Sequence, residues 1–248
     1  MRSGAIVRTL AIIPARGGSK RIPGKNIKLF CGKPMIAYSI EVARSSGLFD
    51  HVVVSTESDE VAAVARACGA EVPFRRPAEL ANDFTGTDAV FLHAILESER
   101  LYGAADFSCC IYATVPLLSA ERLRAGLEKL ESTGAAAAVA VTTFDYPVFR
   151  ALRAREGGPL EWQWPEHAAT RSQDLPQVVH EAGQFYWVDV ARFKKTPDTL
   201  VDAVPVDVPR WTVQDVDTAE DWDLAERLYA VATMQELRHR EVKESQED

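Results

Sequence analysis

The stretch AIIPARGGSKRIPGKN, residues 11–26, joins a short apolar run to a loop of glycines, prolines and cations. Residues 1–40 hold eight Lys and Arg and no Asp or Glu. The whole chain has 28 Lys and Arg against 36 Asp and Glu, for a net charge of −8. A positive segment on an otherwise negative chain predicts a small anionic ligand, because nucleic acids usually bind a broad basic face.

Length and composition narrow the class of protein. With 248 residues and 47% hydrophobic residues, the chain can bury the core of one large domain. It has no apolar run of about 18 residues, and Leu10–Ile13 is too short for a signal peptide. The four cysteines lack the spacing of a metal or disulfide framework. We therefore expect a cytoplasmic protein without a membrane segment.

Working outward from the opening stretch, apolar strand patterns alternate with helical ones. Strands are predicted at 9–14, 51–56, 71–74, 107–113 and 135–142, and helices at 34–46, 59–68, 87–102 and 120–132. This order predicts an α/β fold with a doubly wound, mostly parallel sheet covered by helices on both faces. Ligands of such sheets bind at the carboxyl ends of the strands, so the loop after residue 14 is the expected site.

The pattern changes at about residue 144. From there to about 190 the chain is rich in Pro, Trp, Arg and Gln, which predicts a small, mostly β insertion within one domain spanning 1–232. Its irregular apolar content predicts exchange between subunits of a homodimer. Strands are expected at 184–190 and 213–216, followed by a helix from Thr218 with Asp221 in a capping-box position. Residues 233–248 form a charged tail, whose last part, RHREVKESQED at 238–248, is expected to fray.

The chemistry of the opening loop favours phosphate. Gly17 and Gly18 let the backbone turn its N–H groups toward an anion. Positive charge comes from Arg16, Lys20, Arg21 and Lys25. A P-loop is the obvious alternative, but Ser19 stands where its first glycine belongs and Asn26 where its Ser or Thr belongs. The loop is therefore predicted to be a phosphate site of another type.

Two carboxylates near the other end offer a metal site. Asp215 and Asp217 are two residues apart, so on an extended strand both face the same side, with Cα atoms about 6.5 Å apart. Such a pair can bind Mg²⁺ together with phosphate oxygens. The alternative is that Asp217 only stabilises the N-terminus of the following helix. The separate phosphate loop favours the metal site.

Four motifs together carry a resemblance to a known family. AIIPARGGSKRIPGKNI, RRPAELANDFTGTD, TRSQDLP and VQDVDTAEDW resemble the acylneuraminate-type cytidylyltransferases, which activate nine-carbon acidic sugars, over residues 9 to about 229. Within that family the chain is most similar to the group acting on pseudaminic acid. The resemblance implies a nucleotidyltransferase-type domain, a dimerising insertion, and a Mg²⁺-dependent reaction of CTP with a 2-keto sugar acid that gives the CMP-sugar and pyrophosphate.

The resemblance also assigns roles to residues. It implies that CTP is bound by residues of the opening loop and by one arginine outside it. These residues are Ala15, Arg16, Gly17, Ser19, Lys20, Lys25, Asn26 and Arg76. It matches Asp215 and Asp217 to the family's metal pair. The reaction itself needs cations and a metal around the triphosphate, because negative charge moves onto the leaving pyrophosphate. Arg16, Lys25, Asp215 and Asp217 are therefore the expected catalytic residues.

Sugar preference is expected from departures from the sialic acid pattern. IYATVPL, residues 111–117, and EAGQFYW, residues 181–187, resemble the enzymes for pseudaminic acid. Candidate sugar contacts are Arg150, Arg171, Gln173, Gln184 and Tyr186, although ordinary packing of Tyr186 is an equal alternative. The same reaction on N-acetylneuraminic or legionaminic acid stays open. A P-loop-type kinase and a catalytically silent nucleotide-sugar-binding protein are more remote alternatives.

Overall fold

A mixed sheet forms the centre of the computed structural model, which describes residues 8–82 and 84–247, with side chains as far as Gln235. Over these residues the sheet has six strands, in the order β10 (Ala203–Asp207), β6 (Ala137–Thr143), β9 (Val179–Asp189), β5 (Phe107–Ile111), β1 (Thr9–Pro14) and β4 (His51–Ser55). Within this sheet, over the described residues, only β9 runs antiparallel to its neighbours, and the other strand pairs are parallel. This confirms the expected mostly parallel sheet.

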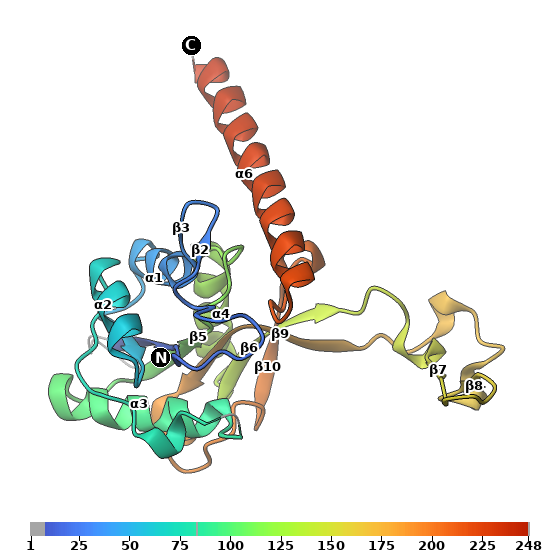
Figure 1. The fold of residues 1–248 in the computed structure, drawn as a ribbon, viewed down its shortest axis with the longest axis horizontal. Helices are drawn as coiled ribbons and strands as arrows, with labels where there is room; N and C mark the ends of the chain where they lie inside the picture. The colour runs from blue at the N-terminus through green and yellow to red at the C-terminus, as the bar shows by residue number, and fades with distance from the viewer. Residues whose placement is uncertain (1–7, 83, 248) are drawn as a thin grey trace.

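Helices cover both faces, because alternate strand residues point to opposite sides. Ala11 and Ile13 pack on the side of α1 (Met35–Ser45), α2 (Asp59–Ala67) and α4 (Ala120–Thr133). Leu10 and Ile12 pack on the side of α3 (Thr87–Tyr102) and the short α5 (Val190–Phe193). Figure 1 shows the sheet between these layers. Burial on both faces explains why β1 and β4 read as continuous apolar runs.

Two strand predictions were wrong, and one strand of the central sheet was missed. Residues 71–74 contribute only a bridge from Glu71 to Val53, and residues 213–216 form no strand after the 3-10 turn η5 (Arg210–Thr212). The missed strand is β10, which has Pro205 at its centre. Proline lacks an N–H and argues against a central strand, but β10 lies at the edge of the sheet, where proline is tolerated.

An arm projects from the body between β6 and β9 (Figure 1). It spans residues 144–178 and contains η2 (Val148–Arg150), β7 (Leu152–Arg153), β8 (Glu161–Trp162), η3 (Pro165–His167) and η4 (Ser172–Asp174). With only two short strands over these residues, it is less regular than the expected β insertion. The expected boundary at 190 also differs from the structure, because residues 179–189 form β9 inside the central sheet.

The last helix, α6 (Ala219–Glu247), leaves the body at a second point (Figure 1). It starts with the predicted capping box: Thr218 N–H donates to the Asp221 carboxylate at 2.8 Å, and Asp221 N–H donates to the Thr218 hydroxyl at 3.2 Å. The backbone is helical through Glu247, so the charged tail continues α6, and the fraying of residues 238–248 stays a prediction. The described helices include none with the length and apolar content needed to cross a membrane.

A small hairpin completes the body. Its strands are β2 (Leu29–Phe30) and β3 (Lys33–Pro34), just after the opening loop. Phe30 is fully buried against Trp222 and Tyr229 of α6. This aromatic cluster fixes the start of α6 beside the opening loop. It thereby brings Asp217 toward that loop.

Candidate active site

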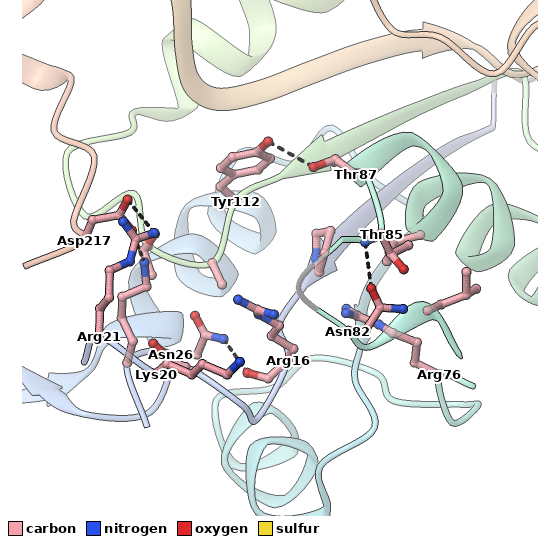
Figure 2. Close-up of a pocket in the computed structure, with 17 residues that line it drawn as sticks. Arg16, Lys20, Arg21, Asn26, Arg76, Asn82, Thr85, Thr87, Tyr112 and Asp217 are labelled. Atoms are coloured by element: carbon pink, nitrogen blue, oxygen red, sulfur yellow. Dashed lines mark hydrogen bonds and ion pairs between the residues drawn. The ribbon is translucent and has the colours of Figure 1, made fainter. Parts of the chain in front are cut away.

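A basic cleft of about 560 Å³ opens at the carboxyl ends of β1, β4 and β5 (Figure 2). Its walls include the predicted residues Arg16, Ser19, Lys20, Lys25, Asn26, Arg76 and Asp217, together with Arg21. The opposite wall comes from Asn82, Thr85, Thr87, Tyr112, Ala113 and Thr114. The cleft lies where ligands of a doubly wound sheet bind.

The opening loop is held in shape by internal hydrogen bonds. The side-chain amide of Asn26 donates to the carbonyl of Arg16 at 2.8 Å, and Asn26 is buried. Gly24 has φ of +62°, a left-handed conformation that favours glycine, and its carbonyl accepts from the N–H groups of Ile27 and Lys28. Asn26 therefore orders the loop as well as lining the cleft.

The backbone at Gly17 and Gly18 differs from the expected arrangement, in which its N–H groups turn toward an anion. Gly17 N–H donates to the Glu57 carboxylate at 2.7 Å, so it is already engaged, and neither Gly17 nor Gly18 has a positive φ. Gly17 is needed for space, because a Cβ there would lie 2.8 Å from the Cβ of Ser58. Ala15 is buried and donates its N–H to Ser55 of β4. The side chains of the loop, more than these backbone groups, face the cleft.

The loop and the distant carboxylate meet in the basic cleft. Lys25 Nζ lies 3.3 Å from Asp217 Oδ1 and donates to the carbonyl of Val216 at 2.6 Å. Arg21 Nη2 lies 2.8 Å from Asp217 Oδ2 (Figure 2). The predicted convergence of the two ends of the domain is therefore present. Asp217 therefore carries two ion pairs in the wall of the basic cleft.

Arg76 forms part of the floor of the basic cleft. It is buried, and its guanidinium donates to the hydroxyl of Ser55 at 3.2 Å and to the Ser55 carbonyl. Burial lowers the pKa of the Arg76 guanidinium, while the nearby Glu57 carboxylate raises it. These hydrogen bonds fix the orientation of the buried guanidinium. It can therefore act as a rigid hydrogen-bond donor to a ligand.

Asp215 faces a second, acidic cleft of about 900 Å³. The acidic cleft is lined by the carboxylates Asp145, Glu181, Asp215 and Asp221 and by Arg210, and it shares Tyr112 and Thr114 with the basic cleft. Although Asp215 is exposed, partial desolvation and the like charge of Asp217 raise the pKa of its carboxyl group, while Lys25 and Arg21 lower it. The two aspartates are thus electrostatic neighbours that point into adjoining clefts.

Asp215 and Asp217 can bind a hard cation only together with oxygen atoms from a ligand. No three His, Cys, Asp or Glu side chains converge in the described part of the chain. The mutual repulsion of Asp215 and Asp217 would be relieved by a cation between them. Two carboxylates plus phosphate oxygens and water are the usual donor set for Mg²⁺. The residues present therefore fit such an ion.

The five predicted sugar contacts do not meet in either cleft. Arg150 and Arg171 lie on the arm, where Arg150 donates to the carbonyl of Thr170 and Arg171 pairs with Asp174 at 2.7 Å. Gln173 is beside them in η4. Gln184 and Tyr186 are buried in β9, where Gln184 donates to the carbonyl of Thr212 at 2.7 Å. Packing accounts for the burial of Tyr186.

Sequence reasoning missed several residues of the cleft walls. Tyr112 and Thr114 form the wall shared by both clefts, and Glu181 lines the acidic cleft. The available signal was position, because Tyr112 directly follows β5 and so lies at the carboxyl edge of the sheet. Glu181 begins the motif EAGQFYW, residues 181–187, which was expected to bear on sugar preference, but the motif did not show which of its side chains faces the cleft.

Comparisons with known proteins find relatives over most of the chain. A family model described as cytidylyltransferase matches residues 10–156. The pseudaminic acid cytidylyltransferase of Campylobacter jejuni subsp. jejuni serotype O:2 is 40% identical over 91% of this chain and 97% of that protein. The N-acylneuraminate cytidylyltransferase of Oncorhynchus mykiss is 34% identical over 91% of this chain and 51% of that protein.

A solved structure shows a similar fold. The structure of CMP:2-keto-3-deoxy-manno-octonic acid synthetase complexed with CTP superimposes with a TM-score of 0.65 at 17% identity. The match covers 91% of this chain and 99% of that one. At this identity the likeness concerns the fold alone.

Proposed function

This chain belongs to the cytidylyltransferase family, and we propose that it joins CMP from CTP to a nine-carbon 2-keto sugar acid, preferably pseudaminic acid. The observation that carries the proposal is the meeting of Arg21 and Lys25 with Asp217 in a cleft that adjoins a second one. The preference for pseudaminic acid is supported by the 40% identity to an enzyme of that name.

In this proposal the basic cleft holds CTP. Arg16, Lys20, Arg21 and Lys25 supply positive charge for the triphosphate, while Ser19 and Asn26 add polar contacts. Arg76 contacts the nucleotide from the floor of the cleft. In the reaction, the anomeric hydroxyl of the sugar releases its proton to water and its oxygen bonds to the α-phosphorus. The bond from that phosphorus to the bridging oxygen breaks, and pyrophosphate leaves. Arg16 and Lys25 stabilise the charge that develops on the leaving group.

Asp217 changes partners as the nucleotide binds. Without it, the carboxylate is paired with Arg21 and Lys25. Phosphate oxygens compete for the same two cations, which frees the carboxylate to bind a cation with Asp215. We propose Mg²⁺ as that ion; when bound, it would neutralise phosphate charge and lower the pKa of a coordinated hydroxyl. Asp215, which faces the acidic cleft, then lies toward the sugar.

The acidic cleft is the proposed sugar site, because it shares the Tyr112 wall with the basic cleft. We further propose a homodimer in which the arm of one subunit supplies Arg150, Arg171 and Gln173 to the partner's sugar site. This accounts for the distance of these residues from the clefts of their own chain. We also propose a cytoplasmic location, where reduced thiols agree with the unpaired state of all four cysteines, each of them among the described residues.

The test is pyrophosphate release by the purified protein with CTP and Mg²⁺. We expect turnover with pseudaminic acid and little with N-acetylneuraminic acid. Equal turnover of the two sugars would contradict the sugar preference alone. No turnover of any nine-carbon 2-keto sugar acid, in a protein that binds CTP, would contradict the proposed reaction.

A further inference from the structure

A chain of packed side chains that carry hydroxyl groups runs between the two clefts through the interior. The hydroxyls of Thr87 and Tyr112 lie 3.1 Å apart in the wall of the basic cleft (Figure 2). The Tyr112 ring packs beside the Tyr186 ring, with their centroids 5.7 Å apart. Tyr186 then donates to Glu181 Oε2 at 2.7 Å. The chain ends at a carboxylate that lines the acidic cleft.

A bulge in β9 makes the last of these contacts possible. Residues five apart on a regular strand are about 16 Å apart and point to opposite faces. In β9, however, Tyr186 pairs with Val139 while Glu181 pairs with Val141, so the intervening residues bulge out of the ladder. Gly183 in this bulge has φ of +60°, which favours glycine. The bulge therefore returns Glu181 to the Tyr186 hydroxyl.

The direction of the hydrogen bond follows from the carboxylate. An ionised carboxylate can only accept hydrogen bonds, so the Tyr186 hydroxyl is the donor in its hydrogen bond with Glu181. Tyr186 is only 4% exposed, whereas Glu181 is exposed at the cleft. A buried, fixed donor thus holds one oxygen of an otherwise accessible carboxylate.

The other oxygen of Glu181 is available to a ligand. No residue within the described ranges donates a hydrogen bond to Oε1. Glu181 also belongs to no cluster of three potential metal ligands in that part of the chain, so it does not extend the Asp215 and Asp217 pair. What remains is a carboxylate of fixed orientation, facing the cleft proposed for the sugar.

We propose that Glu181 is a specificity-determining residue that accepts a hydrogen bond from an N–H or O–H group of the sugar acid, and that Tyr186 is its positioning residue. This inference rests on the proposed function. It also orients the ligand, because the sugar's own carboxylate is repelled by Glu181 and must bind elsewhere. A fixed acceptor discriminates strongly, since a sugar without a donor at that place leaves the carboxylate unpaired.

The test compares Glu181→Gln and Tyr186→Phe with the wild type by steady-state pyrophosphate release. In Glu181→Gln one face of the side chain becomes an N–H donor, so we expect the KM for pseudaminic acid to rise about 10- to 100-fold. In Tyr186→Phe the carboxylate remains but is no longer held, so a rise of about 3- to 10-fold is expected. The KM for CTP and kcat should change by less than about threefold, because neither Glu181 nor Tyr186 lines the basic cleft.

Matched controls exist at the other end of the sheet. Tyr102 donates to Glu71 Oε2 at 2.6 Å, a second tyrosine and glutamate pair that lies away from both clefts. Glu71→Gln and Tyr102→Phe make the same chemical changes there and should leave the sugar KM unchanged. Circular dichroism and thermal melting of all four variants establish that each is folded.

The outcomes separate the inference from the function. An unchanged sugar KM in folded Glu181→Gln, or a fall in kcat without a change in sugar KM, would overturn the role of Glu181. A wild type that turns over no sugar acid would overturn the proposed function instead. If the KM penalty appears with pseudaminic acid and not with N-acetylneuraminic acid, Glu181 bonds a donor particular to the first; an equal penalty means a donor that both present.

Discussion

Asp217 follows the last strand of the domain and contacts cations of the opening loop. It lies within ion-pair distance of Lys25, 192 positions away in the sequence, and of Arg21. In Asp217→Ala these cations lose their partner and the proposed metal loses a ligand. We expect kcat to fall roughly 10²- to 10³-fold, the cost of losing one preorganised electrostatic group. Pyrophosphate release measures it.

The control for Asp217→Ala uses a carboxylate outside the clefts. Glu128 is exposed on α4, and Glu128→Ala removes the same charge far from the triphosphate. Its kcat should equal that of the wild type. If Asp217→Ala retained wild-type kcat while folded, its place in the catalytic machinery would be disproved.

Asp215 gives a prediction about pH. Its carboxyl pKa is raised above 3.8 in the folded protein, so the ionised form destabilises the fold at neutral pH. The destabilisation decreases as the pH falls through the raised pKa and vanishes below the unfolded value of about 4. We therefore expect Asp215→Asn to melt at a higher temperature than the wild type at pH 7, and at the same temperature near pH 3.5.

Melting curves at several pH values without divalent metal check this, since bound Mg²⁺ would stabilise only the carboxylate form. Asp145→Asn, an exposed pair partner of Arg210, controls for the general loss of charge. A wild type more stable than Asp215→Asn at pH 7 would mean that the neighbouring Lys25 and Arg21 outweigh desolvation and Asp217.

At the scale of elements, α4 depends on a close approach to β9. A Cβ on Gly126 would lie 2.7 Å from Trp187 and 2.8 Å from Phe185, both buried ring side chains. Trp187 is also fixed, because its indole N–H donates to the carbonyl of Leu123 at 2.9 Å. Gly126 is thus the point where the helix meets the sheet.

Gly126→Ala tests this contact against helix propensity. Alanine favours a helix by about 1 kcal/mol over glycine, but overpacking a core costs about 1–3 kcal/mol. The rings cannot move freely, so we expect net destabilisation, measured by urea unfolding. A Cβ on Gly134, in the left-handed C-cap of the same helix, would meet no heavy atom within 4 Å, so Gly134→Ala should destabilise through backbone conformation alone. A more stable Gly126→Ala would contradict the packing account.

At the scale of the whole molecule, the arm is separable from the sheet. Thr143 and Val179 face each other across β6 and β9, so a turn of about four residues can replace residues 144–178. We expect the shortened protein to fold and bind CTP, but to be a monomer by light scattering and inactive toward the sugar. A shortened protein that stays dimeric, or that turns over sugar, would refute the proposed role of the arm.

Complementation tests the same role in the full-length chain. Arg171→Ala and Asp217→Ala each damage a different part of a site that two subunits are proposed to share. Mixed under conditions that exchange subunits, they should regain activity, because one site in the hybrid receives an intact arm and an intact Asp217. Activity that stays at the level of the separate variants would place Arg171 outside the partner's site.

The sequence by itself determined the alternation of strands and helices, the basic loop after β1 and the capping box of α6. These features depend on local periodicity and turn chemistry, which neighbouring residues settle among themselves. The sequence also predicted that cations and the Asp pair lie together, but through resemblance and strand order, not through contacts. It misread β10 because Pro205 is unfavourable in a strand unless the strand lies at an edge.

Only the tertiary structure decided where the individual side chains point. It turned Asp215 and Asp217 into adjoining clefts, placed Arg150 and Arg171 on the arm, and brought Glu181 to Tyr186 through a bulge. Strand register and bulges arise from pairing between distant segments, and a shift of one residue reverses the face that a side chain takes. Local sequence does not contain that information, because the packing of the whole molecule sets it.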